Sequence, residues 1–155
     1  MQFSSKEDIE APIETVFAAL SEFEVFERSA IRRGIEVQRA DEAAPNAAGL
    51  IWNAAFDMRG KKRDLKLTLT EYDPPNGMRF DSESFGLGGE MLIDLVALSP
   101  RRTRMSLSLT LSPKTLSARL FLQSLKLAKA SLTSRFEQKA KEFAKGIEAR
   151  AATVA

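Results

Sequence analysis

The pattern that decides the fold runs from Leu50 to Thr70 and reads LIWNAAFDMRGKKRDLKLTLT. Every second residue from Leu50 to Met58 is apolar or small, and Leu65, Leu67 and Leu69 then alternate with polar residues. Alternation with a period of two is typical of strands that bury one face and expose the other. Gly60 lies between the two runs and marks a hairpin. The segment therefore predicts two adjacent antiparallel strands.

The same pattern continues toward the C-terminus, where turn residues separate three more strands. The turns are Asp73–Gly77 (DPPNG), Gly86–Gly89 (GLGG) and Ser99–Arg102 (SPRR). Residues 2–10 and Ile35–Asp41 add two strands, which makes seven. The connections between consecutive strands after Ile35 are too short for parallel crossovers, so we expect an antiparallel sheet. Both phases of residues 91–98 are mostly apolar, and the sequence leaves open whether Asp94 lies near a buried edge.

Two short helices are expected between the first two strands. Pro12 suits the first position of a helix, and Ile13, Val16, Phe17 and Leu20 follow at helical spacing. A second helix is predicted to begin at Ser21-Glu22 and to end at Gly34, with Phe23, Phe26 and Ala30 on one side.

A long amphipathic helix is predicted to close the chain. Ser112 would cap it and Pro113 would be its first residue. Its apolar stripe comprises Ala118, Phe121, Leu122, Leu125, Ala128, Leu132, Phe136, Ala140, Phe143 and Ile147. We expect order to be lost near Gly146 and in the frayed tail at about residues 149–155. Leu116, Leu120 and Leu127 lie nearly opposite the stripe. They would form a dimer contact, line the entrance to the interior or be covered by a neighbouring loop.

Composition excludes several kinds of chemistry. The chain has no Cys and no His, which excludes a disulfide, a thiol nucleophile, a Ser–His–Asp triad and a typical zinc site. We therefore expect no metal site and no cofactor. Residues 114–155 hold nine Lys/Arg and three Asp/Glu, a net charge of +6, whereas residues 1–113 hold 14 and 18, a net charge of −4. This asymmetry fits either a solvated helix face or attraction to an anionic membrane surface or ligand. No nucleic-acid-binding motif accompanies it.

The order of these elements resembles the START-like (SRPBCC) superfamily, in particular bacterial polyketide cyclase/dehydrase-like and coenzyme-Q-binding-type members. The residues that carry the resemblance are Ala11–Phe17 (APIETVF), Leu20–Glu24 (LSEFE), Gly49–Trp52 (GLIW), Thr70–Pro75 (TEYDPP) and Leu111–Pro113 (LSP). The resemblance implies an α+β helix-grip fold, in which a seven-stranded curved antiparallel sheet wraps around a long C-terminal helix. It spans residues 1–155 as a single domain and implies an internal cavity.

Apolar residues on the inward phase of the strands and of the last helix are the candidates for lining that cavity. Together with two serines among them, the candidates from the sheet and the helix are Trp52, Phe56, Leu67, Leu69, Phe80, Ser82, Leu107, Leu109, Phe121, Ser124, Leu125, Leu132 and Phe136. Ser82, Ser84 and Ser124 either orient a polar group of the ligand or bond only to backbone and water. Trp52 is either a core anchor or a surface on which a ligand stacks.

Catalytic residues are harder to find. Asp57, Asp64, Asp81 and Glu83 fall on the solvent-facing phase, which leaves Asp94 as the one weak candidate. The basic residues at Arg59–Arg63 and Arg101–Arg104 lie on two hairpins that we expect at one end of the sheet.

The leading hypothesis is a carrier or binding protein for a hydrophobic small molecule such as a lipid, a quinone or a polyketide-like compound. The alternatives are a cyclase or hydrolase-type enzyme in the same cavity, or a protein-interaction module. No secretory signal is readable at residues 1–8, so we expect a cytoplasmic protein, either a monomer or a weak homodimer.

Overall fold

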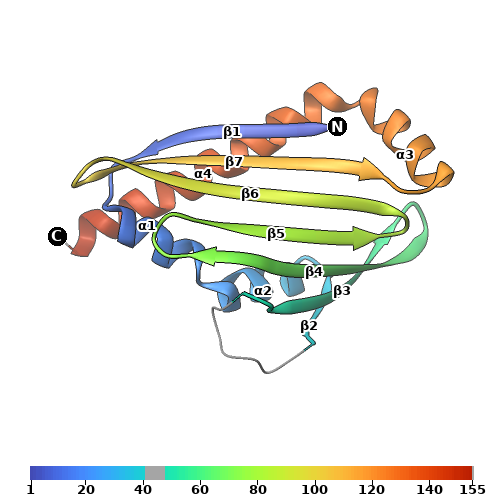
Figure 1. Cartoon of the computed structure of the whole chain (residues 1–155), viewed down its shortest axis with the longest axis horizontal. Helices are drawn as coiled ribbons and strands as arrows, with labels where there is room; N and C mark the ends of the chain where they lie inside the picture. Colours follow the sequence, from blue (N-terminus) through green and yellow to red (C-terminus); the bar gives the residue numbers. More distant parts are fainter. Residues whose placement is uncertain (41–47, 155) are drawn as a thin grey trace.

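A computed structural model describes residues 1–40 and 48–154. Its strands are β1 (Gln2–Ile9), β2 (Glu36–Arg39), β3 (Ile51–Met58), β4 (Lys61–Asp73), β5 (Gly77–Ser84), β6 (Leu87–Ser99) and β7 (Arg102–Pro113). Its helices are α1 (Ile13–Leu20), α2 (Phe23–Arg32), α3 (Leu116–Lys126) and α4 (Lys129–Val154). The predicted α+β class is confirmed, with two short helices between the first two strands (Figure 1). Asp41, at the end of the strand expected from Ile35, lies outside the described residues.

The strands of the described residues form one antiparallel sheet in the order β1-β7-β6-β5-β4-β3-β2. Because each strand reverses the last, successive hairpins alternate between the two ends of the sheet. The β4–β5 and β6–β7 turns lie near α1, and the β3–β4 and β5–β6 turns lie near α3 (Figure 1). We call these the α1 end and the α3 end. The expectation that both basic hairpins share one end is therefore wrong, since the segments Arg59–Arg63 and Arg101–Arg104 lie at opposite ends.

At the α1 end, the basic residues of β7 are paired with acids of the edge strand β1. Nε of Arg104 donates to Oδ1 of Asp8 at 2.8 Å, and Arg102 reaches Asp8 at 3.6 Å and Glu10 at 3.2 Å. The hydrogen bond from Arg104, with the positive charges of Arg104 and Arg102, holds the pKa of Asp8 below its usual value. The charge of this hairpin is thus largely neutralised within the chain.

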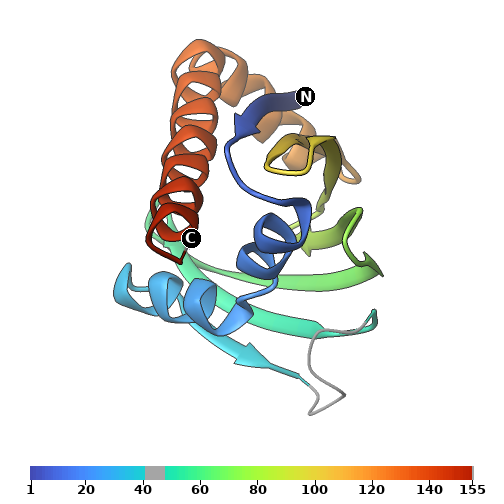
Figure 2. The same ribbon diagram turned by 90° about the vertical axis from the view of Figure 1, so that its left-hand side faces the viewer.

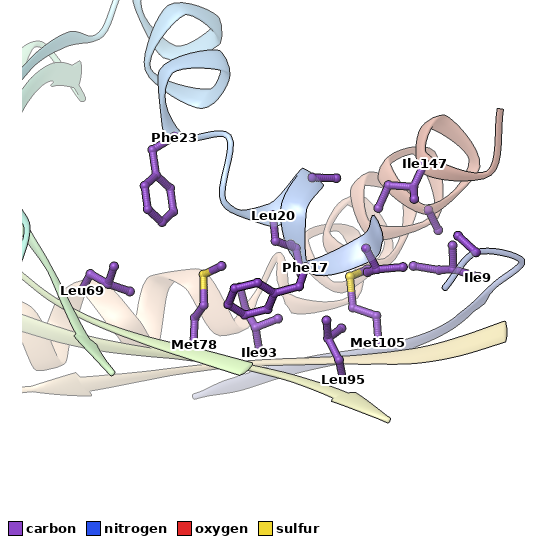
Figure 3. Packing of buried hydrophobic residues seen from close by; sticks show 14 of the residues in the cluster. Ile9, Phe17, Leu20, Phe23, Leu69, Met78, Ile93, Leu95, Met105 and Ile147 are labelled. Carbon is purple, nitrogen blue, oxygen red and sulfur yellow. The ribbon is translucent and has the colours of Figure 1, made fainter. Parts of the chain in front are cut away.

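The core lies on the inner face of the sheet beneath α1. Phe17 and Leu20 of α1 pack over Met78, Ile93, Leu95 and Met105 of the sheet, as Figure 3 shows. Helix α4 passes beside β1 and α1 rather than across the middle of the sheet (Figure 2). As a result the two ends of the inner face are covered by different elements, α1 at one and α3 at the other.

The structure resolves the phase of residues 91–98. Ile93 and Leu95 are buried on the inner face, whereas Asp94 is exposed on the outer face, opposite Gly77 and Ser106. Asp94 is therefore not a buried carboxylate, and the burial on which its suggested catalytic role depended is absent. The inward phase of this strand could not be read from the sequence, because Val96 and Leu98 are apolar although they are exposed.

An irregularity in β4 changes which residues face inward. The register with β5 shifts between Leu69 and Glu71, so that Tyr72 pairs with Met78 and faces the same side as Leu69. A bulge of this kind inserts one extra residue, which reverses the alternation beyond it. Without the bulge, Tyr72 would point to solvent.

The C-terminal region differs from the single helix that we expected. Strand β7 continues through Pro113, and the helix begins only after Thr115, whose hydroxyl accepts a hydrogen bond from the N–H of Ala118 at 3.1 Å. Thr115, not Ser112, is thus the N-cap. The helix is then interrupted at Leu127–Ala128, and this interruption separates α3 from α4. Helix α4 continues through Val154, past the point where we expected order to end, and Arg150 pairs with Glu22 of the α1–α2 connection.

Candidate functional site

The inner face of the sheet brings the predicted cavity residues of the strands together. Cross-strand pairing aligns Trp52 with Leu67, Leu67 with Ser82, and Leu69 with Phe80, so all of them face one side. Leu109 continues this row through its pairing with Met91, which in turn pairs with Phe80. The remaining predicted strand positions, Phe56 and Leu107, lie on the same face. Alternation along each strand therefore predicted which residues share the inner face, because directly opposed residues of neighbouring strands lie on the same face.

Burial along this face falls from the α1 end toward the α3 end. Leu69 and Met105 are fully buried, and Met78, Ile93 and Leu95 nearly so. Closer to α3 the apolar side chains are only half-buried; these are Phe56, Leu65, Leu67, Phe80, Met91, Leu107, Leu109 and Leu111. We call this set the inner apolar band. Side chains on the covered side of a sheet are normally fully buried, whereas those of the band keep apolar surface that water can reach.

The helices add further half-buried apolar residues near the band. Phe121 and Leu125 of α3 and Leu132 and Phe136 of α4 were predicted to line the cavity, and all four are half-buried. Phe136 lies 6.2 Å from Phe3 of β1, which anchors α4 on the sheet edge. Leu122, which we expected in the apolar stripe of the helix, is buried on α3.

The three serines that we considered have different surroundings. Ser84 donates to the carbonyl oxygen of Asp64 on β4, so its hydroxyl is satisfied by backbone. Ser124 donates to the carbonyl oxygen of Phe121 and accepts from Arg59 at 2.9 Å. Ser82 is half-buried beside Leu67 and has no hydrogen-bond partner among the described residues. Ser82 is therefore the serine whose hydroxyl is available in the band.

Trp52 is a core residue with its polar edge satisfied. Its ring packs against Phe23 at 5.4 Å and Phe80 at 6.2 Å, and only 5% of the residue is exposed. Its indole N–H donates to Glu27 of α2 at 2.6 Å, and Arg39 of β2 pairs with the same carboxylate. Of the two interpretations of Trp52, the structure shows the core anchor.

Two arginines and two aromatic rings form a cluster at the α3 end, and both arginines belong to the basic segment Arg59–Arg63 noted in the sequence. The guanidinium of Arg59 lies 4.8 Å from the ring of Phe121, and that of Arg63 lies 4.8 Å from the ring of Phe85. The two rings meet edge to face at 5.1 Å. We call these four residues, with Ser124, the α3-end cluster. It joins the β3–β4 hairpin, the β5–β6 hairpin and α3 through cation–π contacts.

Arg63 of this cluster has an unusual feature. Its Nε is buried and, among the described residues, is the one buried side-chain nitrogen or oxygen without a hydrogen-bond partner. Neither Arg59 nor Arg63 makes an ion pair with a described carboxylate, although other basic residues such as Lys62 and Lys114 do. Register with Phe56 places Arg63 on the inner face. The α3 end of the inner apolar band thus carries unpaired positive charge.

A separate pocket of about 850 Å³ lies at the α1 end, between α1, α2 and the β4–β5 turn. Its apolar lining includes Phe17, Phe23 and Tyr72. Its charged lining is of both signs and comprises Glu14, Glu22, Glu24, Arg28 and Arg39. None of the predicted cavity residues lines it. Sequence reasoning missed this pocket because it is assembled from the consecutive helices α1 and α2 and from a turn that is distant from them along the chain. The motif LSEFE at residues 20–24 was the one available signal.

Aromatic side chains separate this pocket from the inner apolar band. Phe17 lies 5.1 Å from Tyr72, and Phe23 lies 6.3 Å from Phe80. The Tyr72 hydroxyl donates to Ser21 at 2.9 Å, and Ser21 donates to the carbonyl of Phe17. Phe17, Phe23 and Tyr72, which we call the aromatic partition, therefore line the pocket on one side and contact the core on the other.

The acidic side chains of the central strands give little support to catalysis. Asp57, Asp64 and Glu83 are exposed on the outer face, and Asp81 pairs with Arg79 there, as expected from alternation. The described residues contain no group of three acidic side chains placed to hold a metal ion. No helix among them has the length and apolarity needed to cross a bilayer.

Solved structures with the same architecture cover nearly the whole chain. A protein from Thermus thermophilus superposes with a TM-score of 0.62 at 20% identity, covering 100% of this chain and 99% of that one. The Zhui aromatase/cyclase from Streptomyces gives 0.64 at 13% identity, covering 97% and 94%. A START superfamily protein from Mycobacterium smegmatis gives 0.51 at 16% identity, covering 88% and 97%. The chain has the helix-grip fold, an architecture that it shares with these structures.

The similarity between this chain and the solved structures is a similarity of architecture. No protein-family model matches the sequence, and no curated protein matches it either. Since proteins of one fold perform many different functions, the function of this helix-grip protein has to be argued from its own residues.

Proposed function

We propose that this helix-grip protein binds a hydrophobic small molecule at the inner apolar band. The observation that carries the proposal is the contrast in burial along one continuous face. Leu69 is fully buried beneath the α1 end, whereas Leu67, one inward position away on the same strand, is half-buried. Apolar side chains on an inward face lose the free energy of burial when they stay accessible to water. A hydrophobic ligand that covers these side chains recovers the free energy of burial.

The size of this effect is considerable. Burying apolar surface contributes about 25 cal/mol per Å², which is roughly 1.5–3 kcal/mol for one Leu or Phe side chain taken from exposed to fully buried. The band residues are already half-buried, so each can gain only part of this free energy when a ligand covers it. Several of them acting together still support binding in the micromolar range, which corresponds to about −8 kcal/mol.

The α3-end cluster gives the site polarity. Arg59, Arg63 and the free hydroxyl of Ser82 lie at or near the half-buried end of the band. Ligand sites are commonly apolar with a few polar groups that fix orientation. We therefore propose a ligand with an extended apolar part along the band and an electron-rich oxygen toward the arginines. A lipid, a quinone or a polyketide-like compound fits this description.

Native mass spectrometry of the full chain, followed by denaturing extraction, tests the proposal. The expected result is a stoichiometric hydrophobic compound that is released on denaturation. A protein that is empty, and whose Trp52 fluorescence does not change with fatty acids or quinones, would contradict it.

A substitution in the band sharpens the test. Leu67→Trp adds bulk at a half-buried position of the band and should lower affinity for the extracted compound by at least tenfold, or about 1.4 kcal/mol. Val96→Trp adds the same bulk on the outer face of β6, where Val96 is 57% exposed, and should leave affinity unchanged. Equal affinity of both variants and the wild type would place the ligand elsewhere, with the pocket at the α1 end as the next location to examine.

A further inference from the structure

Helix α3 exposes a row of large apolar side chains. Leu116 is 71% exposed, Leu120 is 57% exposed and Leu127 is 94% exposed. Their spacing of four and seven residues puts them on one side of the helix. No described residue covers them, so among the residues that the structure describes no loop takes the covering role that the sequence left open. We call these three residues the leucine patch.

The opposite side of α3 is already occupied. Ala118 and Leu122 are buried, Phe121 belongs to the α3-end cluster, and Ser124 accepts from Arg59. Thr115 caps the helix through the N–H of Ala118. The helix is thus fixed to the sheet by one side, and the leucine patch faces away from the molecule. Exposed apolar groups that are held in this way mark a surface for interaction.

Charge around the patch is of one sign. From Lys114 to Phe136 the sequence has five cationic residues and no Asp or Glu. Lys114 pairs with Glu83, but Arg119 and Lys126 are exposed and make no ion pair with a described carboxylate. Arg119 and Lys126 are seven residues apart and therefore share a side of α3, next to the leucines. The surface combines apolar side chains with unpaired positive charge.

We propose that α3 docks on an anionic membrane surface, with the leucine patch in the interface and Arg119 and Lys126 at the head groups. Amphipathic helices with leucine on one side and Lys/Arg beside it bind at the boundary between head groups and acyl chains. Anionic lipids attract such cations. This docking does not depend on the ligand-binding proposal.

A second copy of the chain is a poorer occupant for the same surface. In a twofold dimer a patch faces its own copy. Arg119 and Lys126 would then approach their counterparts, and the segment around them supplies no acidic residue to compensate. Like charges brought together in this way oppose association. An anionic membrane removes this conflict, because its head groups provide the missing negative charge.

Docking by α3 would also place the α3-end cluster near the bilayer. Phe121 and Ser124 lie on the inner side of the same helix and contact Arg59. The half-buried end of the inner apolar band would therefore lie next to the membrane, while the pocket at the α1 end would lie at the far end of the sheet (Figure 1).

Co-sedimentation of the full chain with vesicles tests the docking. The vesicles are phosphatidylcholine alone, or equal parts of phosphatidylcholine and phosphatidylglycerol. We expect binding to the anionic vesicles alone, and weaker binding when salt rises from about 0.1 M to about 1 M, since the Debye length falls from about 10 Å to about 3 Å. L120E/L127E should lower binding by at least about tenfold, and R119Q/K126Q should lower it on the anionic vesicles by a similar factor.

The matched control is V96E/L98E, which replaces two exposed apolar residues on the outer face of β6, 57% and 42% exposed, and should bind as the wild type does. All substituted positions are exposed, and circular dichroism verifies that each variant is folded. The proposal is overturned if the wild type does not sediment with anionic vesicles, or if L120E/L127E sediments as well as V96E/L98E. It is equally overturned if sedimentation velocity shows a wild-type dimer that is lost in L120E/L127E, and the wild type does not bind vesicles.

Discussion

The indole nitrogen of Trp52 donates a hydrogen bond of 2.6 Å to Oε2 of Glu27. This bond joins β3 to α2, and Arg39 of β2 pairs with the same carboxylate. One acidic side chain therefore connects three elements beside the pocket at the α1 end. It also explains how a Trp that is 5% exposed keeps its N–H satisfied.

Removing that carboxylate should destabilise the protein. Glu27→Ala leaves the N–H of Trp52 buried without an acceptor, which costs about 1–3 kcal/mol in the free energy of unfolding. Urea denaturation followed by Trp52 fluorescence measures the change. Glu24→Ala, on the exposed side of the same helix, should cost no more than about 1 kcal/mol. Equal losses for the two variants would show that the hydrogen bond contributes nothing.

The gradient of burial on the inner face predicts a gradient of stability. Leu69→Ala should cost about 2–5 kcal/mol, because Leu69 is fully buried and a cavity would remain. Leu65→Ala, at a half-buried position of the same strand, should cost less than about 1.5 kcal/mol in protein freed of ligand. Chemical denaturation of both variants measures the difference. A loss at Leu65 as large as at Leu69 would mean that the α3 end is packed as tightly as the α1 end.

The position of the cap distinguishes the observed start of α3 from the predicted one. Thr115→Ala removes the hydroxyl that accepts from the N–H of Ala118 and should cost about 0.5–2 kcal/mol. Ser112→Ala, at the cap position expected from sequence, should change stability by less than about 0.5 kcal/mol. The reverse order in thermal or urea unfolding would favour a helix that begins at Pro113.

Asp8 makes stability depend on pH in the acidic range. The hydrogen bond and the positive charge of Arg104 keep the pKa of folded Asp8 below its ordinary value of 3.8. The unfolded chain therefore binds this proton at a higher pH than the folded one, and the stabilisation is complete above 3.8 and is lost as pH falls through the lowered pKa.

Asp8→Asn should thus lower the melting temperature at neutral pH and reduce its fall in acid. Calorimetry at neutral pH and at several values below 3.8 measures both effects. Asp57→Asn is the control, because Asp57 is exposed and makes no ion pair with a described residue. A wild type and an Asp8→Asn variant that lose stability in parallel as pH falls would contradict the assignment.

Much of the fold and part of the candidate site could be predicted because the signals are local. Alternation at Leu65, Leu67 and Leu69 identifies a strand, and Pro12 and Gly34 mark a helix start and a helix stop. The inward position of Phe80 and Leu109 follows from the same alternation. These features depend on neighbours two to four residues away, which the sequence contains.

Other features depend on residues that are distant along the chain. The break between α3 and α4 at Leu127–Ala128 contains no Gly or Pro, and the α3-end cluster joins Arg59, Arg63 and Phe121 only after three elements have packed. The hydrogen bond from Trp52 to Glu27 spans 25 positions and could not be read from spacing.

The sequence by itself determined the strands, the two short helices, the helical C-terminal region and the absence of thiol and imidazole chemistry. Only the tertiary structure decided which phase of residues 91–98 faces inward, which end of the inner face stays half-buried, and that Leu116, Leu120 and Leu127 are left uncovered. The physical reason is that a side chain's periodicity is a property of its own strand or helix. Its burial is a property of whatever packs against it, and here α1 covers one end of the inner face more fully than α3 and α4 cover the other.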